Sequence, residues 1–410
     1  MELKEEIKDI KFISIEDFNC SSILCFLSES FASNNVKGIK NIILVFIHLL
    51  QRVFLNLFSY EVVESRGSQK ILFAFNERLI RRDIYDMFFK IFQCSNDSTF
   101  IRIHCHSSFT SLPEIKERIT LSFRWWKQMK DTKLTPLQKV SSVSLLILIK
   151  HYSKQIEPYF NYDVLVTRYD ALDTDNIVTQ IFKNQGKITV TAQHGMMYSS
   201  RGVPFSGIYF YNSISDYFLA WNNMTKTEAI KDGLEERKIK VCGIARCIDA
   251  PKSRAVYNKT IGIVLDGYDY LNVEMIAIAN LFCKKTGYKY YLRYHPFYKG
   301  SEYDSLVSKS YYLGNSRGSL IDYSNRVEFS IVANSTVLLE LLYMKHRTYV
   351  FSKDTAVEIY YKYVPVFHNI LELDCLISSS SYEKEVYDEL VTVEDIRKQY
   401  SQFFKEITRD

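Results

Sequence analysis

Short apolar strands alternate with helices along most of this 410-residue chain, and this alternation restricts its fold more than any other feature. Residues 70–92 predict a strand, a polar turn at Asn76 and Glu77, and an amphipathic helix. The same order recurs at 163–186 and at 217–243. Because the helix between two strands returns the chain to the edge where the first strand began, such units form parallel sheets.

The alternation stops at 249–260, where we expect the link between two domains. It then resumes, with strands predicted at 261–265, 288–292 and 328–332. A single core rarely extends beyond about 300 residues, and this chain is longer. We therefore predict an α/β protein with two Rossmann-like, doubly wound domains that face a cleft. The predicted parts are an N-terminal domain at 1–252, a C-terminal domain at 258–385, and a helical segment at 386–410 that packs back on the N-terminal domain.

The composition is that of a folded globular protein, with 47% hydrophobic and 24% charged residues. The net charge of +5 is spread along the chain, so no concentrated basic stripe indicates nucleic-acid binding. The eight cysteines form no CxxC pair, and we see no secretory signal before them. These observations favour a protein of the reducing cytoplasm.

Two segments bear on membrane contact. Residues 41–58 are apolar, but His48, Gln51 and Arg52 interrupt them, which argues against a transmembrane helix. Residues 116–133 mix basic side chains with phenylalanine and tryptophan. That mixture suits either a helix with a solvated basic face or a helix that lies on an anionic membrane surface.

Polar side chains follow the predicted strands at the edge where parallel sheets bind ligands, because helix N-termini and loop amides converge there. In the N-terminal half these residues are Glu77, Asp170, Gln193, His194 and Gly195. In the C-terminal half they are Asp266, Gly267, Arg293, His295, Pro296, Ser335 and Thr336. We expect both sets to face one cleft.

The C-terminal set predicts a site for phosphate oxygens. Ser335 and Thr336 begin a predicted helix, where unpaired N–H groups and the helix dipole favour an anion. Arg293 and His295 lie two residues apart, so both point to one face of their strand. Glu340 comes one turn after Thr336, where its carboxylate could accept hydrogen bonds from ribose hydroxyls. The alternative is an ordinary N-cap with a solvent-facing glutamate.

His194 is the main candidate for acid–base chemistry in the N-terminal half. A neutral imidazole can deprotonate an acceptor hydroxyl, and a protonated one can donate to a phosphate. Asp170, in a loop rich in aspartates, and Glu77 compete for the role of general base. Alternatively, Gln193 and His194 only tie the backbone of the loop together.

Several common chemistries lack their motifs in this chain. The histidines show no HExxH or HxxxH spacing, so we expect no metal site. The chain has no GxxxxGK[ST] loop and no GxGxxG after a strand, which argues against kinase-like and dinucleotide-binding sites. We therefore expect no cofactor.

The ordered set QHG, DYFLAWN…DGLEERKIKVCGIARCID, YLRYHP and NSTVLLELLYMKHRTYVF resembles bacterial surface-polysaccharide transferases of the GT-B architecture. It is similar in particular to the CDP-glycerol glycerophosphotransferases and the capsule Kdo and sialic acid transferases. The resemblance spans about 160–352 and implies a metal-independent enzyme whose CMP-, CDP- or UDP-linked donor is held by the C-terminal domain. It also implies a catalytic role for His194 and contacts to the donor phosphates by His295, Pro296, Ser335 and Thr336. Gly243 and Arg246, which follow a predicted strand, are further candidates for the cleft.

One departure concerns the acidic-acidic-Gly element that serves sialyl- and polysialyltransferases as general base. The comparable pair here, Asp266 and Gly267, lies in the C-terminal domain, which weakens a sialic acid donor. We predict a glycosyltransferase that moves a sugar from a nucleotide-linked donor to a capsule, O-antigen or other surface glycan, free or lipid-linked. It would work in the bacterial cytoplasm, in peripheral contact with the anionic membrane. The alternatives are a polyol-phosphate transferase with a CDP-linked donor and a catalytically silent GT-B scaffold.

Overall fold

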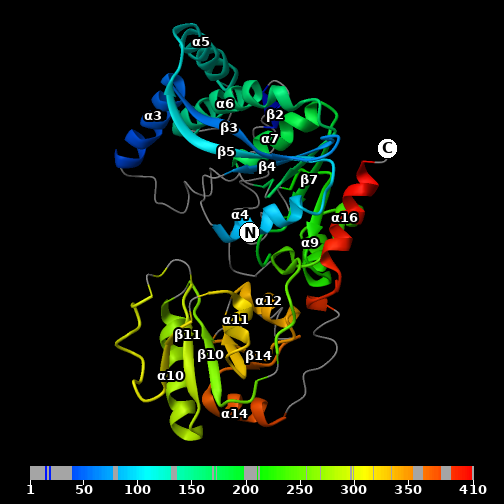
Figure 1. Cartoon of the computed structure of the whole chain (residues 1–410). Helices are drawn as coiled ribbons and strands as arrows, with labels where there is room; N and C mark the ends of the chain where they lie inside the picture. The colour runs from blue at the N-terminus through cyan, green and yellow to red at the C-terminus, as the bar shows by residue number, and fades with distance from the viewer. Residues whose placement is uncertain are drawn as a thin grey trace.

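The computed structural model shows two α/β parts stacked one above the other, with the C-terminal helix beside the upper part (Figure 1). In that view the blue-to-green half of the chain lies above the yellow-to-orange half. The structure describes residues 14–15, 18–19, 39–76, 82–130, 136–168, 170–171, 173–197, 210, 213–254, 256–267, 269–295, 298, 300–316, 318–333, 335–353, 363–379 and 389–408.

The upper part contains a seven-stranded sheet with the order β3-β5-β4-β6-β7-β8-β9. Its strands are β3 (Leu55–Ser65), β4 (Ile71–Asn76), β5 (Ser98–Phe109), β6 (Val164–Thr167), β7 (Ile188–Ala192), β8 (Tyr217–Ala220) and β9 (Ile239–Val241). β3 runs antiparallel to β5, and the other neighbours are parallel. β4 is buried along its whole length, as expected where helices cover both faces. Apart from this sheet, β1 (Ser14–Ile15) pairs with β2 (Phe18–Asn19).

Helices cover both faces of the seven-stranded sheet. They are α3 (Ile39–Phe54), α4 (Arg82–Phe92), α5 (Leu112–Gln128), α6 (Pro136–Ile156), α7 (Asp173–Asn184) and α9 (Asn223–Lys231), with the 3-10 turns η1 (Glu157–Tyr159), η2 (Glu236–Lys238) and η3 (Ala245–Cys247). One face of β4 and β6 packs against α6 and α7 in a core that includes Leu72, Leu165 and Phe182. The opposite face, with Phe73 and Val166, packs against α4. None of the described helices has the length and hydropathy that crossing a bilayer requires.

The lower part contains six parallel strands in the order β12-β11-β10-β13-β14-β15, which is the 3-2-1-4-5-6 order of a Rossmann sheet. The strands are β10 (Thr260–Val264), β11 (Lys289–Arg293), β12 (Tyr312–Asn315), β13 (Phe329–Val332), β14 (Thr348–Phe351) and β15 (Val366–Phe367). The helices are α10 (Asp269–Thr286), α11 (Leu320–Ser324), α12 (Val337–Tyr343) and α14 (Ile370–Ser379). The predicted α/β class with two Rossmann-like sheets is thus confirmed.

Most predicted strands have their expected bounds within one residue, and one such difference matters. β11 extends through Arg293 instead of ending at 292, because Arg293 pairs with Val264 of β10. Its carbonyl also accepts the Leu265 N–H at 2.9 Å. Arg293 is therefore the last residue of a strand, and the pleat of the sheet fixes the side of the sheet to which its side chain points.

The C-terminal helix α16 (Ile396–Ile407) packs on the upper part of the molecule. Tyr400 donates its hydroxyl to the Gly243 carbonyl at 3.3 Å, and the Phe404 ring lies 5.4 Å from that of Phe73. The predicted helical segment at 386–410 includes 386–388 and 409–410, which lie outside the described residues. Within the described part, Asp395 caps the helix by accepting the Lys398 N–H at 3.0 Å, so α16 itself begins at 396.

One apolar cluster continues from the upper sheet into the lower one. It joins Phe75 of β4, Val264 of β10 and Leu338 of α12, together with the inner face of α16. The two parts therefore contact one another through side chains that are excluded from water. This contact fixes the position of one sheet relative to the other.

Candidate functional site

The turn after β7 is built by Gln193, which is almost completely buried. Its Oε1 accepts the Trp221 N–H at 2.6 Å, and its Nε2 donates to the Gly195 carbonyl at 2.7 Å. These bonds fix the backbone on both sides of His194, whose side chain is partly exposed. Gln193 thus positions the turn, and His194 is the residue of this turn that has a titratable side chain for chemistry.

The turn after β7 contacts the start of α12 in the other half of the molecule. The Met196 N–H donates to Thr336 Oγ1 at 3.3 Å. Gly195 also lies near this hydroxyl, since a Cβ at this position would lie 3.8 Å from Thr336 Oγ1. The structure therefore brings the predicted elements QHG and NST together, although 140 residues separate Met196 from Thr336.

The predicted anion site at Ser335 and Thr336 has a different form from the one expected. α12 has only seven residues, and Thr336 at its N-cap makes no side-chain capping bond. Ser335 Oγ accepts the Val337 N–H at 3.4 Å, and Thr336 Oγ1 accepts from Met196. Because an accepting hydroxyl keeps its own hydrogen for a second partner, both groups can still donate to a phosphate oxygen.

A network of charged side chains crosses between the two halves near α12. Arg246 of η3 pairs with Asp83 of α4 at 2.8 Å, and its Nε lies 3.9 Å from the Glu340 carboxylate. Burial raises the pKa of Glu340, against the opposing attraction of Arg246 and Arg293. Glu340 therefore faces protein cations instead of solvent, contrary to the alternative of a solvent-facing glutamate. Arg246 acts as the link between the two halves.

Arg293 lies on the lower side of the same region. Its Nη1 donates to the Gly318 carbonyl at 3.1 Å, and its guanidinium carbon lies 5.7 Å from the centre of the Tyr323 ring. Burial lowers the pKa of Arg293, while Tyr323 and Glu340 oppose this shift. His295 follows two residues after the end of β11, and its ring lies 6.5 Å from that of Tyr298.

Two predicted carboxylates are held by hydrogen bonds within the protein, Asp170 from a distant segment and Asp266 from the next residue. Asp170 is buried, and its oxygens accept the N–H groups of Ile214 at 2.8 Å and Ser215 at 2.6 Å and the Ser213 hydroxyl. Burial raises the pKa of Asp170, although these hydrogen bonds oppose the shift. The buried Asp266 accepts the Gly267 N–H at 2.5 Å. Such bonds favour a role in shaping the loops over a role as general base.

The remaining predicted residues contribute little to this geometry. Gly243 has a φ of +94° and supports α16, so its role is in packing. Glu77 and Pro296 lie outside the described residues. The sequence did not single out Arg168, which directly follows β6 and is buried. The signal was present, however, because VLVTR and YYLR both end an apolar strand with an arginine.

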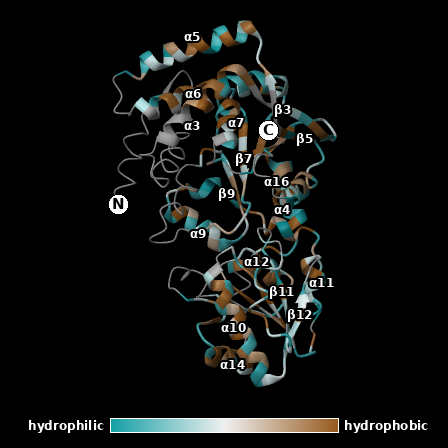
Figure 2. Cartoon of the chain, turned by 90° about the vertical axis from the view of Figure 1, so that its left-hand side faces the viewer, coloured by the Kyte–Doolittle hydropathy of each residue, from teal (hydrophilic) through white to brown (hydrophobic). Residues whose placement is uncertain are grey.

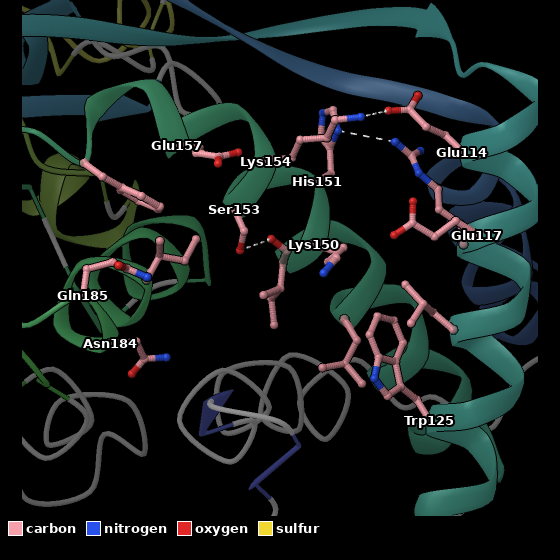
Figure 3. A pocket seen from close by; sticks show the side chains of 16 residues that line it. Glu114, Glu117, Trp125, Lys150, His151, Ser153, Lys154, Glu157, Asn184 and Gln185 are labelled. Carbon is pink, nitrogen blue, oxygen red and sulfur yellow. Dashed lines mark hydrogen bonds and ion pairs between the residues drawn. The ribbon is translucent and has the colours of Figure 1, made fainter.

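A separate cavity of about 550 Å³ lies between α5, α6 and α7, away from the strand-edge residues (Figure 3). Two of its charged side chains are held by partners within the protein. Lys154 binds Glu114 at 2.5 Å, and Arg118 donates to the Arg52 carbonyl at 2.9 Å and to Thr110 at 3.0 Å. None of the predicted site residues lines this cavity, so the candidate site remains the meeting point of the two sheet edges.

Comparison with known proteins gives a fold and no family. No family model matches the chain, and no curated protein matches it. A UDP-GlcNAc 2-epimerase from Methanocaldococcus jannaschii is similar with a TM-score of 0.53 and 11% identity, over 83% of this chain and 100% of the other. An enzyme from Listeria monocytogenes described as a UDP-N-acetylglucosamine 2-epimerase gives 0.54 and 13%, over 83% and 96%. The lipopolysaccharide outer core galactosyltransferase WaaB gives 0.48 and 12%, over 82% and 100%. The similarity to the two epimerases shows that the chain has a GT-B-like fold.

Proposed function

We propose that this protein is a glycosyltransferase that moves a sugar from a nucleotide-linked donor to a bacterial surface glycan. The observation that carries the proposal is the contact between Met196 and Thr336. It brings the turn that carries His194 to the hydroxyl of Thr336, at the edges of the two Rossmann-like sheets. We expect the guanidinium of Arg293 to complete the site beside them. An acid–base group that faces phosphate-binding donors is what transfer from a nucleotide-linked donor requires.

Each side chain then has a defined task. Ser335, Thr336, Arg293 and His295 donate to the phosphate oxygens, where negative charge develops as the bond to the sugar breaks. His194 faces the acceptor and takes the proton of the attacking hydroxyl. For this task the imidazole of His194 has to be neutral.

The proposal is tested with the full chain and a panel of CMP, CDP, UDP and GDP. We expect one nucleotide to raise the melting temperature, and its sugar-linked form to be consumed only when a glycan acceptor is present. His194→Ala should lower turnover by about 100-fold or more while nucleotide binding persists. His295→Ala should weaken nucleotide binding as well.

Other outcomes assign other functions. Consumption of UDP-GlcNAc without acceptor, with formation of the C2 epimer, would instead make the protein an epimerase. Release of CMP from CDP-glycerol would indicate transfer of a polyol phosphate. Nucleotide binding without turnover in any assay would leave a binding scaffold.

We also propose peripheral contact with an anionic membrane through α5. Figure 2 shows polar and apolar residues alternating along this helix at the outer end of the molecule. Phe123 is 74% exposed, and Lys116, Arg124 and Lys127 are exposed beside it. Such a helix buries apolar side chains at the lipid interface while its cations meet anionic headgroups. Phe123→Asp should abolish co-sedimentation with phosphatidylglycerol vesicles, and neutral vesicles should bind neither protein.

A further inference from the structure

Arg168 carries a positive charge that the described residues do not neutralise. Its side chain is only 4% exposed, and its Nε has no hydrogen-bond partner. No described carboxylate forms an ion pair with its guanidinium. A buried cation without a counter-charge is expensive, because it has lost its hydration and gained no partner in return.

The position of Arg168 places this charge at the candidate site. It directly follows β6, whose neighbours in the sheet are β4 and β7. This is the point where the strand order of the upper sheet reverses, and open α/β sheets bind ligands there. The pairing of Thr167 in β6 with Thr191 in β7 puts Arg168 beside Ala192. His194 comes two residues after Ala192, just beyond the end of β7. Because side chains alternate along extended chain, Arg168 and His194 are expected on one face.

The side chain of Arg168 is held on an aromatic surface. Its guanidinium carbon lies 5.8 Å from the centre of the Phe75 ring, which itself packs edge-on against Tyr85 of α4 at 5.2 Å. An aromatic face supports a guanidinium and leaves the edge of its plane, where the N–H groups point, for an anion. This contact orients the cation without neutralising its charge.

The carboxylate nearest along the sequence does not complete the pair. Both oxygens of Asp170 are bound by the segment 213–215. Arg118 provides the contrast, because it is also buried and its guanidinium donates to two carbonyls and to the Thr110 hydroxyl. A structural arginine in this protein is thus surrounded by acceptors, and Arg168 is not.

We propose that Arg168 binds an anionic oxygen group, either a phosphate or a carboxylate, of the ligand that meets His194. A guanidinium binds such groups through two parallel N–H···O bonds, which also orient the ligand. The anion comes either from the phosphates of the donor or from an acidic group on the acceptor glycan. The identity of that ligand rests on the proposed function, whereas the binding of an anion does not.

The test compares the full chain with Arg168→Met, which removes the charge at similar length, and Arg168→Lys, which keeps it. Arg237→Met is the control, since this arginine is exposed and pairs only with Glu235 on the surface. Melting temperatures are measured without ligand, and affinities by calorimetry for pyrophosphate, CMP, CDP, UDP, glycerol 3-phosphate and glucuronate. We expect Arg168→Met to melt at the same or a higher temperature than the wild type, while its affinity for the bound anion falls about 10- to 100-fold. Arg168→Lys should recover part of that affinity.

The ligands distinguish the two sources of the anion. Loss of nucleotide affinity alone assigns Arg168 to the donor phosphates, and loss of glycerol 3-phosphate or glucuronate affinity alone assigns it to the acceptor. If no nucleotide binds the wild type but another anion binds in an Arg168-dependent manner, the proposed function fails and this inference stands. The inference is overturned if every anion binds Arg168→Met as it binds the wild type, if no anion binds either protein, or if Arg168→Met melts well below the wild type.

Discussion

The main-chain N–H of Met196 donates to Thr336 Oγ1 at 3.3 Å, and this bond joins the edges of two sheets that fold from different halves of the chain. Gln193 fixes the turn that presents Met196, through its bonds to Trp221 and Gly195. The bond therefore transmits the position of His194 to the phosphate-binding donors that we propose at α12. A substitution at Thr336 should therefore affect both the turn that carries His194 and the start of α12.

Thr336→Val tests this contact, since it removes the hydroxyl and keeps the shape. The Met196 N–H then loses its acceptor, which should cost about 1 kcal/mol of stability. If the hydroxyl also donates to the donor phosphate, kcat/KM should fall about tenfold as well. Thr336→Ser keeps the hydroxyl and is the matched control. Equal turnover of both variants would show that the Thr336 hydroxyl does not contact the donor phosphate.

Arg246→Ala tests the charged link between the halves. It leaves Asp83 and the partly buried Glu340 without their cation, which should cost about 3 kcal/mol near neutral pH. Burial already raises the pKa of Glu340, and loss of Arg246 should raise it further. The penalty should therefore shrink as the pH falls and Glu340 takes up a proton, and Glu340→Gln should recover part of the loss.

Urea unfolding at pH 8 and at pH 5 measures the effect of Arg246→Ala. Arg237→Ala, on an exposed pair with Glu235, should change nothing measurable and serves as the control. If Arg246→Ala lowered the free energy of unfolding equally at both pH values, the loss would not come from the unpaired charge of Glu340.

Much of the fold could be predicted from the sequence because each strand–helix unit is encoded locally. The β-branched run at 188–192 predicts a strand, and Gly233 marks the end of the helix that precedes this glycine, and both signals are visible without any tertiary contact. The extension of β11 through Arg293 could not be predicted in this way. It depends on pairing with Val264, which is a partner from another unit.

For the candidate site, the sequence indicates only which residues follow the ends of strands. Proximity to a strand end made Asp170 and Arg168 equivalent in the sequence, and only contacts that are distant along the chain separate them. Ser213–Ser215 bind the carboxylate of Asp170, whereas Arg168 has Phe75 beneath it and pairs with no carboxylate of the described residues. The bond between Met196 and Thr336 has no sequence signal at all, because its donor is a main-chain N–H.

Gly262→Ala should destabilise the lower sheet severely. A Cβ at this position would lie 1.9 Å from Tyr323 Oη, and Tyr323 is fully buried and bonded to Ser330 at 3.2 Å. We expect a loss of about 3 kcal/mol or more. Gly195→Ala, where the Cβ meets Thr336 Oγ1 at an ordinary 3.8 Å, is the control for stability. Tyr323→Leu removes the obstructing hydroxyl, so the double variant should lose less than the sum of both changes.

Gly243 and Gly233 form a matched pair that isolates the packing of α16. Their φ values are +94° and +95°, so alanine should strain the backbone at both positions by about 1 kcal/mol. At Gly233 nothing lies within 4 Å of the new Cβ, whereas at Gly243 it would lie 2.8 Å from Ile396. Gly243→Ala should therefore cost more and expose α16 to limited proteolysis. Equal losses would show that α16 yields to the new methyl group.

His346 should make the stability of the protein depend on pH between about 4 and 6.5. The side chain is buried against the Ser330 hydroxyl at 2.9 Å, and burial lowers its pKa from 6.5 to about 4. The unfolded chain therefore takes up this proton at a higher pH than the folded one. The stabilising contribution is complete above pH 6.5 and declines as the pH falls toward 4, by about 3 kcal/mol in total. His346→Gln should flatten the free energy of unfolding across this range. A difference curve between His346→Gln and wild type without slope would show that burial does not lower the pKa of this imidazole.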